Sequence, residues 1–372
     1  MLHAKLSPSS SSRWLTCTAS VKASEQYDNS TNSAAEWGTT VHGIGEIMLK
    51  GGTVSIGDVV EGLEVDKEML ECAEEYFDYC TALCKKDTVK LIEEKFDLGF
   101  IAPDTFGTGD FSCLNGTHLD IVDLKTGRNI VKAPNNTQLM LYALGAIHEL
   151  ETYGYEIETV TLHIVQTRAG HVDTWDTTVE DLLGFETFAK AQAENIKNDI
   201  VTFNPEAKAC AWCPHRTNCE ALQQHVLETV QGSFEDLEDL EGNADVIDNS
   251  HLKKILDNAE LIVAFVKACQ DVALEKLQSG EEIEGYKVVE SRTNRKWQDE
   301  KEVEEYLKKK KVKVDDMYSK KLKSMTQILK LRPNDEELKA MLYKPQGSPT
   351  LAPITDKRPP LASTVDCFEK LD

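Results

Sequence analysis

The residues best suited to chemistry lie in one short stretch, FGTGDFSCLNGTHLDIVDLKTG, which carries Asp110, Asp123 and Lys125. Asn115-Gly116 is a typical two-residue hairpin turn, so the stretch predicts two antiparallel strands that place Asp110 beside Asp123. Asp123 and Lys125 are two positions apart on the second strand and therefore point to the same face. Two carboxylates and an ammonium group should converge on one point.

This convergence suits the hydrolysis of a phosphodiester bond. Carboxylates supply the hard oxygen ligands that Mg²⁺ and Mn²⁺ prefer. A bound ion lowers the pKa of a coordinated water, and Lys125 can orient that water or stabilise the developing charge. The D-x-K pattern alone is common, and an exposed strand with solvated charges is the alternative. The apolar Ile121 and Val122 before Asp123 favour a site at the end of a buried strand.

A second candidate site is the run CAWCPHRTNC, in which Cys210, Cys213 and Cys219 are closely spaced. Three thiolates this close need a fourth ligand, and four thiolates suit either a [4Fe-4S] cluster or a structural Zn²⁺ ion. In a zinc site the fourth ligand could be His215. The spacing alone leaves both metals open. The other six cysteines have no ligand spacing and are expected to be small buried apolar side chains: Cys72, Cys80, Cys84, Cys113, Cys269 and Cys367.

The elements that must position these residues follow from local patterns. A helix with Thr39 or Thr40 as N-cap should carry His42, and the run VKLIEEKFDLGFI before the hairpin should be a strand. Apolar spacing and β-branched runs predict the remaining elements around the hairpin: helices over 66–86, 137–151 and 179–198, and a strand over 157–168.

The pattern GTGD followed by IVDLKTG resembles the RecB-type branch of the PD-(D/E)XK nucleases, over about residues 9–225. The resemblance implies an α/β fold, a restriction-endonuclease-like core with a mixed sheet flanked by helices. In it, Asp110, Asp123 and Lys125 match the catalytic acids and lysine. His42 resembles the helical histidine that serves as a further metal ligand, and the Leu124 carbonyl is implied as an additional ligand.

Three other residues match motifs of this branch. Gln138 and Tyr142 resemble its Q-x-x-x-Y motif, and at i and i+4 they share one helix face. There they could contact substrate or brace the site, although a polar helix start and a core tyrosine would give the same pattern. Glu94 resembles the acid on the strand before the hairpin, with the adjacent Glu93 as the alternative.

A subset of these nucleases carries a [4Fe-4S] cluster with one cysteine before the nuclease core and three after it. By this resemblance Cys17, in RWLTCTAS, is the fourth ligand beside Cys210, Cys213 and Cys219. The resemblance favours iron–sulfur over zinc. Such a cluster would act as a staple that closes a loop of about 200 residues and constrains the unfolded chain.

Length and charge limit the remaining possibilities. The 372 residues suggest two domains, or one large domain with an extension. A net charge of −23 argues against nonspecific binding to a polyanion, although bound cations reverse the local field of metal-holding carboxylates. No run of 18 apolar residues occurs, and the first residues lack a signal-peptide pattern. We therefore expect no membrane segment and a cytoplasmic location, in a bacterial host cell if the gene belongs to a phage.

The acidic, turn-rich segment 231–250 is the best boundary between domains. A mostly helical region should follow, with a long helix from 252 to 273, a short strand at Tyr286–Val289 and lysine-rich helices over about 299–342. Lys309, Lys310 and Lys311 belong to the most basic stretch of the chain, 308–323, which is either a solvated face or a track for DNA. The expected organisation is a stapled nuclease domain at 1–230, a linker at 231–250, a helical domain at 251–343 and an extended tail at 344–372.

The layout, including SRTNRKW and PTLAPITDKRPPL, resembles an uncharacterised phage and prophage family of such nucleases. The function implied is a Mg²⁺- or Mn²⁺-dependent deoxyribonuclease, an exonuclease in phage recombination or replication. The rival hypotheses are a non-catalytic DNA-binding protein with the same fold and a zinc-stapled protein-interaction module. DNA is the implied partner; a recombination or single-strand-binding protein and a homo-oligomer remain open.

Overall fold

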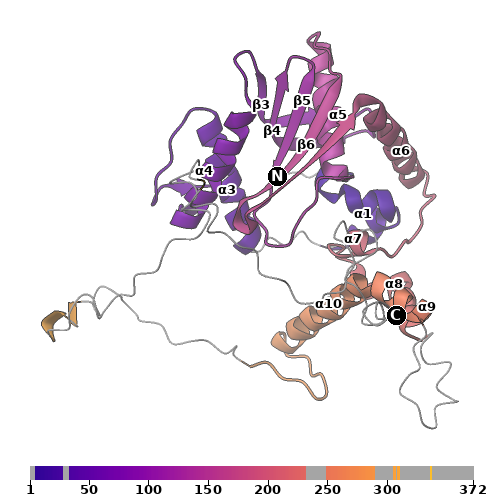
Figure 1. The fold of residues 1–372 in the computed structure, drawn as a ribbon. Coiled ribbons are helices and arrows are strands. Elements are labelled where there is room, and N and C mark those ends of the chain that lie inside the picture. The colour runs from indigo at the N-terminus through magenta and orange to yellow at the C-terminus, as the bar shows by residue number, and fades with distance from the viewer. Residues whose placement is uncertain are drawn as a thin grey trace, which may run out of the picture. The chain divides into compact units, whose positions relative to one another are not determined.

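The computed structural model describes residues 5–27, 33–231 and 249–289, and the separate positions 305–306, 308–310 and 336. The chain divides into two compact units, Met1–Val289 and Glu290–Asp372. In the first unit a five-stranded mixed sheet is flanked by helices on both faces (Figure 1). The predicted α/β class is therefore confirmed.

The sheet has the strand order β3-β4-β5-β6-β7, in which only β5 and β6 run parallel. The predicted hairpin is confirmed: Asn115 pairs with His118, and Gly116 takes the left-handed conformation that the turn requires (φ 69°). The strands are β3 (Val89–Asp97), β4 (Phe106–Asn115), β5 (His118–Leu124), β6 (Thr159–Gln166) and β7 (His171–Thr178).

One face of the sheet is covered by α3 (Ser33–Leu49) and α4 (Lys67–Leu83), next to the ribbon of β1 (Val59–Val60) and β2 (Leu63–Glu64). The predicted N-cap of α3 was wrong, because the helix begins at Ser33. Thr39 and Thr40 lie inside it, where no cap is needed, and their hydroxyls donate to the carbonyls of Ala35 and Glu36 one turn earlier.

The other face is covered by α5 (Thr137–Thr152) and α6 (Val179–Lys197), with the short helices η1 (Pro8–Ser10), α1 (Ser11–Thr16) and α2 (Ser20–Ser24) nearby. Asn136 caps α5 by accepting from the amides of Gln138 and Leu139. Gly145 lets α5 approach the sheet, since a Cβ there would lie 2.5 Å from the Cβ of Phe96. This contact sets the distance between α5 and β3.

The last part of the first unit is helical. It comprises α7 (Ala207–Cys210), η3 (Arg216–Asn218), α8 (Glu220–Gln231), α9 (Asn249–Asp257) and α10 (Ala259–Gln278), whereas η2 (Thr167–Ala169) lies earlier, between β6 and β7. The predicted long helix is two helices, broken at Asn258, whose side chain contacts His225 and the Lys254 carbonyl. None of the described helices is both long and apolar enough to cross a membrane.

The helix α10 packs through Leu261 and Phe265 onto Leu222 and the cysteine segment. The first compact unit therefore includes α9 and α10, which the sequence analysis assigned to a separate region beginning at 251. The predicted strand at Tyr286–Val289 is not formed, because no described strand pairs with these residues. Most of 299–342 and the whole tail from 344 lie outside the described residues, so their predicted organisation stays a prediction.

Candidate metal centre and cysteine cluster

Three side chains from three elements meet at one end of the sheet. His42 on α3, Glu93 on β3 and Asp110 on β4 each offer a ligand atom, and these atoms lie within 4.8 Å of one another. The His42 Nδ1 atom is 3.2 Å from Asp110 Oδ1. Two residues predicted from the sequence, His42 and Asp110, are thus brought together in a set of donors that is compatible with a divalent metal ion.

The third member of this set is Glu93 rather than Glu94, the residue that the sequence analysis selected. Glu93 has a left-handed backbone (φ 49°), and the regular β3–β4 pairing is interrupted there. On a regular strand Ile92 and Phe96 would share a face, yet Ile92 packs on the α3–α4 side and Phe96 on the α5 side. The distortion switches the alternation and turns Glu93 toward His42. Strained backbone of this kind is often retained at functional sites.

Lys125 connects Asp123, on β5 of the sheet, to Gln138 on α5. Lys125 Nζ lies 2.8 Å from Asp123 Oδ2 and donates to Gln138 Oε1 at 3.0 Å. Gln138 Nε2 in turn donates to the Tyr142 hydroxyl at 3.1 Å. The structure therefore joins the D-x-K element and the Q-x-x-x-Y element in one chain of contacts.

Asp110 is tied to the same strand end, because its Oδ2 atom accepts the Leu124 amide at 2.6 Å. Asp110 is 9% exposed and Asp123 is 2% exposed, so both carboxylates are almost completely removed from water. The Leu124 amide faces Asp110. The role of its carbonyl as a metal ligand stays a prediction.

Burial and mutual repulsion dominate the electrostatics of this site. Burial lowers the pKa of His42, but the Asp110 carboxylate outweighs it and raises that pKa to about 9. Burial and the charge of Asp110 raise the pKa of Glu93 to about 8. Burial also raises the pKa of Asp123 against the opposing effect of Lys125. Carboxylates held this close repel one another unless a cation lies between them.

The donor set fits a divalent cation by its chemistry. The His42 nitrogen and the Glu93 and Asp110 carboxylate oxygens lie within 4.8 Å of one another, and Mg²⁺ and Mn²⁺ prefer oxygen donors of this kind. A cation there would also relieve the repulsion between the Glu93 and Asp110 carboxylates, which contributes to the raised pKa of Glu93. Asp123 Oδ2 faces the Lys125 ammonium at 2.8 Å.

The cysteine cluster lies apart from this centre. Cys17, at the end of α1, lines one pocket together with Cys210, Cys213 and Cys219, and all four are buried. Burial, with the nearby thiols adding to it, raises the pKa of Cys210 to about 11. His215 lines the same pocket, with Nδ1 3.1 Å from the Tyr27 hydroxyl. Cys17 thus lies in the same pocket as the distant triplet, and the binding of a metal by the four thiols stays a prediction.

The basic residues predicted to contact DNA lie in the second unit. Lys309 and Lys310 are exposed, and the Lys310 ammonium is 5.6 Å from the ring centroid of Tyr306. Lys311 and the remainder of the run to 323 lie outside the described residues. Their contact with DNA stays a prediction.

One buried residue near the site carried no signal in the sequence. Gln166, fully buried at the end of β6, holds the loop that follows Lys125. Its Nε2 atom donates to the carbonyls of Gly127 at 2.6 Å and Asn129 at 2.7 Å, and its Oε1 atom accepts the Val131 amide at 3.1 Å. A single side chain therefore fixes the start of the connection between Lys125 and α5.

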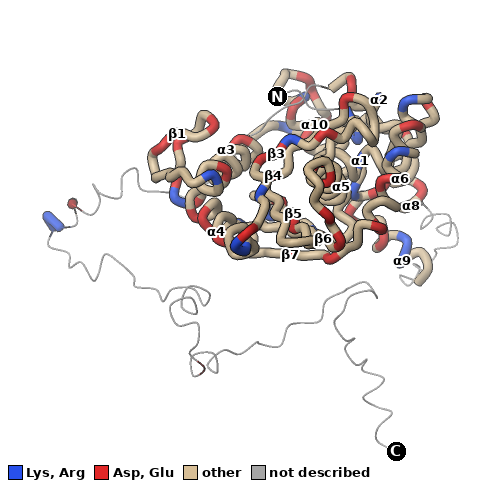
Figure 2. Tube along the Cα trace, turned by 90° about the horizontal axis from the view of Figure 1, so that it is seen from above, with Lys and Arg blue, Asp and Glu red and all other residues tan. Residues whose placement is uncertain are grey.

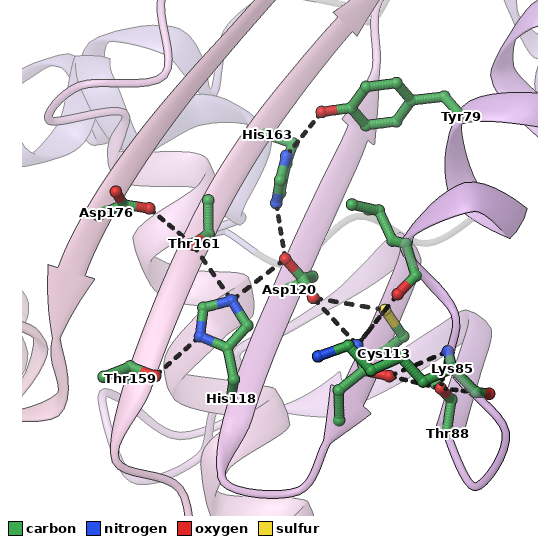
Figure 3. Close-up of polar contacts among 12 residues, drawn as sticks. Tyr79, Lys85, Thr88, Cys113, His118, Asp120, Thr159, Thr161, His163 and Asp176 are labelled. Carbon is green, nitrogen blue, oxygen red and sulfur yellow. Dashed lines mark hydrogen bonds and ion pairs between the residues drawn. The ribbon is translucent and has the colours of Figure 1, made fainter.

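A second polar network was also missed. Asp120, three residues before Asp123, faces α4 and lies 3.0 Å from His163 Nε2 and 3.4 Å from His118 Nε2 (Figure 3). His163 Nδ1 is 2.8 Å from the hydroxyl of Tyr79 on α4. Asn115 and Cys113 donate to the other carboxylate oxygen. The network joins α4 to β5 and β6 and is separate from the metal centre.

This network predicts an acid-dependent contribution to stability. Burial raises the pKa of Asp120, but the hydrogen bond and charge of His163, with His118, outweigh it and lower that pKa. The ionised carboxylate therefore stabilises the fold above its unfolded-state pKa of about 3.9, and this contribution is lost as the pH falls through the folded-state value. We expect Asp120→Asn to lower the free energy of unfolding by about 1–3 kcal/mol near neutral pH.

Urea unfolding of the parent and Asp120→Asn at a series of pH values would check this. The difference between their free energies of unfolding should shrink below about pH 4. Asp87→Asn, which alters an exposed carboxyl in the loop before β3, is the control and should behave like the parent. A difference that is constant from neutral to acid pH would contradict the assignment.

The comparisons with known proteins add the following. Among solved structures, one described as the crystal structure of SSO0001 is 14% identical in sequence, with a TM-score of 0.22. The match covers 37% of this chain and spans 60% of the length of that one. A family model described as a protein of unknown function, DUF2800, matches residues 3–359. Because that match covers almost the whole sequence, the chain belongs to the DUF2800 family.

Proposed function

We propose that this protein is a metal-dependent deoxyribonuclease with a PD-(D/E)XK core, which hydrolyses DNA phosphodiester bonds as an exonuclease in phage recombination or replication. The observation that carries the proposal is the meeting of His42, Glu93 and Asp110 at the strand end that also holds Asp123 and Lys125. Nitrogen and carboxylate donors beside a partly buried lysine suit phosphoryl chemistry. The exonuclease mode and the phage context rest on the sequence resemblance.

Each residue has a definable part in the reaction. His42, Glu93, Asp110 and Asp123 would hold Mg²⁺ or Mn²⁺, which activates water and neutralises phosphate charge when bound. Lys125, held between Asp123 and Gln138, presents its ammonium group to the attacking water or to the developing charge on the phosphate.

Tyr142 and Gln138 keep Lys125 in place. The Tyr142 hydroxyl accepts from the Gln138 amide, which leaves the amide oxygen directed at the lysine. This orientation gives the Q-x-x-x-Y motif a positioning part in the proposed reaction. The neighbouring α5 core holds the two side chains on one helix face.

We also propose that the four cysteines bind a [4Fe-4S] cluster with a structural role. Four buried thiols from two distant segments line one pocket, and four thiolates suit such a cluster or a structural Zn²⁺ ion. The choice of iron–sulfur over zinc rests on the sequence resemblance. The cluster would join α1 to the segment that α10 covers.

The nuclease proposal is tested by two variants at adjacent positions. We expect Mn²⁺ to raise the melting temperature of the parent, because a ligand that binds only the folded state stabilises it, and to support digestion of end-labelled DNA. Glu93→Gln should lose both effects. Glu94→Gln, which removes the same charge one residue later, should keep both.

The digestion would use single- and double-stranded substrates with Mg²⁺, Mn²⁺ or EDTA. A metal-loaded parent that binds but never cuts DNA would favour the non-catalytic alternative. Equal loss in both glutamate variants would show that Glu93 is not the ligand that the geometry selects.

A further inference from the structure

The loop after Lys125 has an unusual combination of an anchored backbone and exposed side chains. Arg128, Ile130 and Lys132 are all exposed, and Ile130 is 55% exposed. The backbone beneath them is held by the three hydrogen bonds of Gln166, and His171 Nε2 lies 3.2 Å from the Val131 carbonyl. An anchored loop loses little conformational entropy when it binds a partner.

The loop also lies at the same end of the sheet as the candidate metal centre. It begins two residues after Lys125, at the carboxyl end of β5 and beside the carboxyl end of the parallel strand β6, where the Lys125 amide donates to the Val165 carbonyl. Open α/β sheets bind ligands at the carboxyl ends of parallel strands. Lys95, exposed and two residues beyond Glu93, lies at the same end of the sheet.

The loop carries two basic side chains in a chain that is acidic overall. The chain has 64 acidic and 41 basic residues, and acidic positions are spread over most of the first unit (Figure 2). Near the loop, Asp173 accepts the Ala133 amide, and Glu68 is paired with Arg168 at 2.9 Å. Among the described residues neither Arg128 nor Lys132 makes an ion pair, so both can bind an external anion.

We propose that the loop 127–132 binds the phosphate backbone of substrate DNA beside the metal centre. Arg128 and Lys132 each contact one phosphate, and Ile130 packs against the sugar edge between them. Lysine and arginine contacts to phosphate position nucleic acid without reading its sequence. This inference rests on the proposed nuclease function and names a different DNA surface from Lys309–Lys311.

The test measures binding apart from cleavage. Arg128→Ala/Lys132→Ala and the parent would be titrated into a fluorescent 20-base-pair duplex, with Ca²⁺ in place of Mn²⁺, at several salt concentrations. Each lost phosphate contact should flatten the plot of log affinity against log salt by about 0.9, hence by about 1.8 for the pair. The affinity near 0.1 M salt should fall by about 10- to 100-fold.

The matched control is Lys86→Ala/Lys90→Ala, which removes two exposed lysines at the opposite end of the sheet and should keep the parent slope. A loop variant with the parent slope would overturn the inference. If Lys309→Glu/Lys310→Glu/Lys311→Glu alone flattened the slope, the DNA path would lie in the second unit and the inference would also fail.

Cleavage by the parent in Mn²⁺ separates the two proposals. If the parent cuts DNA and the loop variant has the same salt slope as the parent, the nuclease proposal stands and the proposal for the loop fails. If the parent never cuts DNA but its binding depends on Arg128 and Lys132, the proposal for the loop stands and the nuclease proposal fails. A parent that neither binds nor cuts DNA overturns both.

Discussion

Asp123→Asn should lower the rate of DNA cleavage on the order of 10³-fold, the scale expected when one group that stabilises transition-state charge is removed. Asp123 is buried, and its Oδ2 atom lies 2.8 Å from the Lys125 ammonium. The amide keeps the shape of the side chain and removes its charge, so a ligand is weakened and Lys125 loses its counter-charge. Cleavage of an end-labelled duplex at saturating Mn²⁺ would measure the loss.

The control for this variant lies three residues earlier on the same strand. Asp120→Asn also removes a buried carboxylate from β5, but its contacts run to His163 and His118 and away from the metal centre. It should lose stability and keep cleavage, measured at a temperature where both variants are folded. If Asp120→Asn lost as much activity as Asp123→Asn, the effect would reflect unfolding and the assignment of Asp123 to the chemistry would fail.

Cys213→Ser should remove the metal from the cysteine cluster and destabilise the fold by up to about 5 kcal/mol, the chain-entropy value for a cross-link that closes a loop of about 200 residues. Cys213 is buried in the pocket with Cys17, Cys210 and Cys219. The anaerobically purified parent should be brown and contain iron, and the variant should be colourless. Metal analysis and urea unfolding would measure the two effects.

Cys269 provides the comparison, because it is exposed on α10, outside the pocket. Cys269→Ser should keep the iron content and the unfolding free energy of the parent, since a ligand is lost only at Cys213. Equal behaviour of the two variants would contradict the staple. If the parent were colourless and contained one equivalent of zinc, the four cysteines would still act as a staple, but the bound metal would be Zn²⁺ in place of the iron–sulfur cluster.

Several parts of the site were determined by the sequence alone, because their geometry is local. Asn115-Gly116 sets a tight hairpin, and the two-residue period of a strand places Asp123 and Lys125 on one face. The i, i+4 spacing of Gln138 and Tyr142 likewise fixes them on one turn of α5. In each case the separation along the chain is short enough for backbone geometry to decide the contact.

Only the tertiary structure decided which distant residues complete the two sites. Glu93 faces the candidate metal centre because its own left-handed backbone reverses the side-chain alternation of β3. The run VKLIEEKF shows no break in its pattern at this position, so the sequence does not reveal the reversal. Gln166 holds the loop after Lys125 across 37 to 39 positions of sequence, and α10 covers the cysteine segment although an acidic stretch separates them. Such contacts depend on how whole elements pack, because side chains far apart in sequence meet only after the sheet and its helices have assembled.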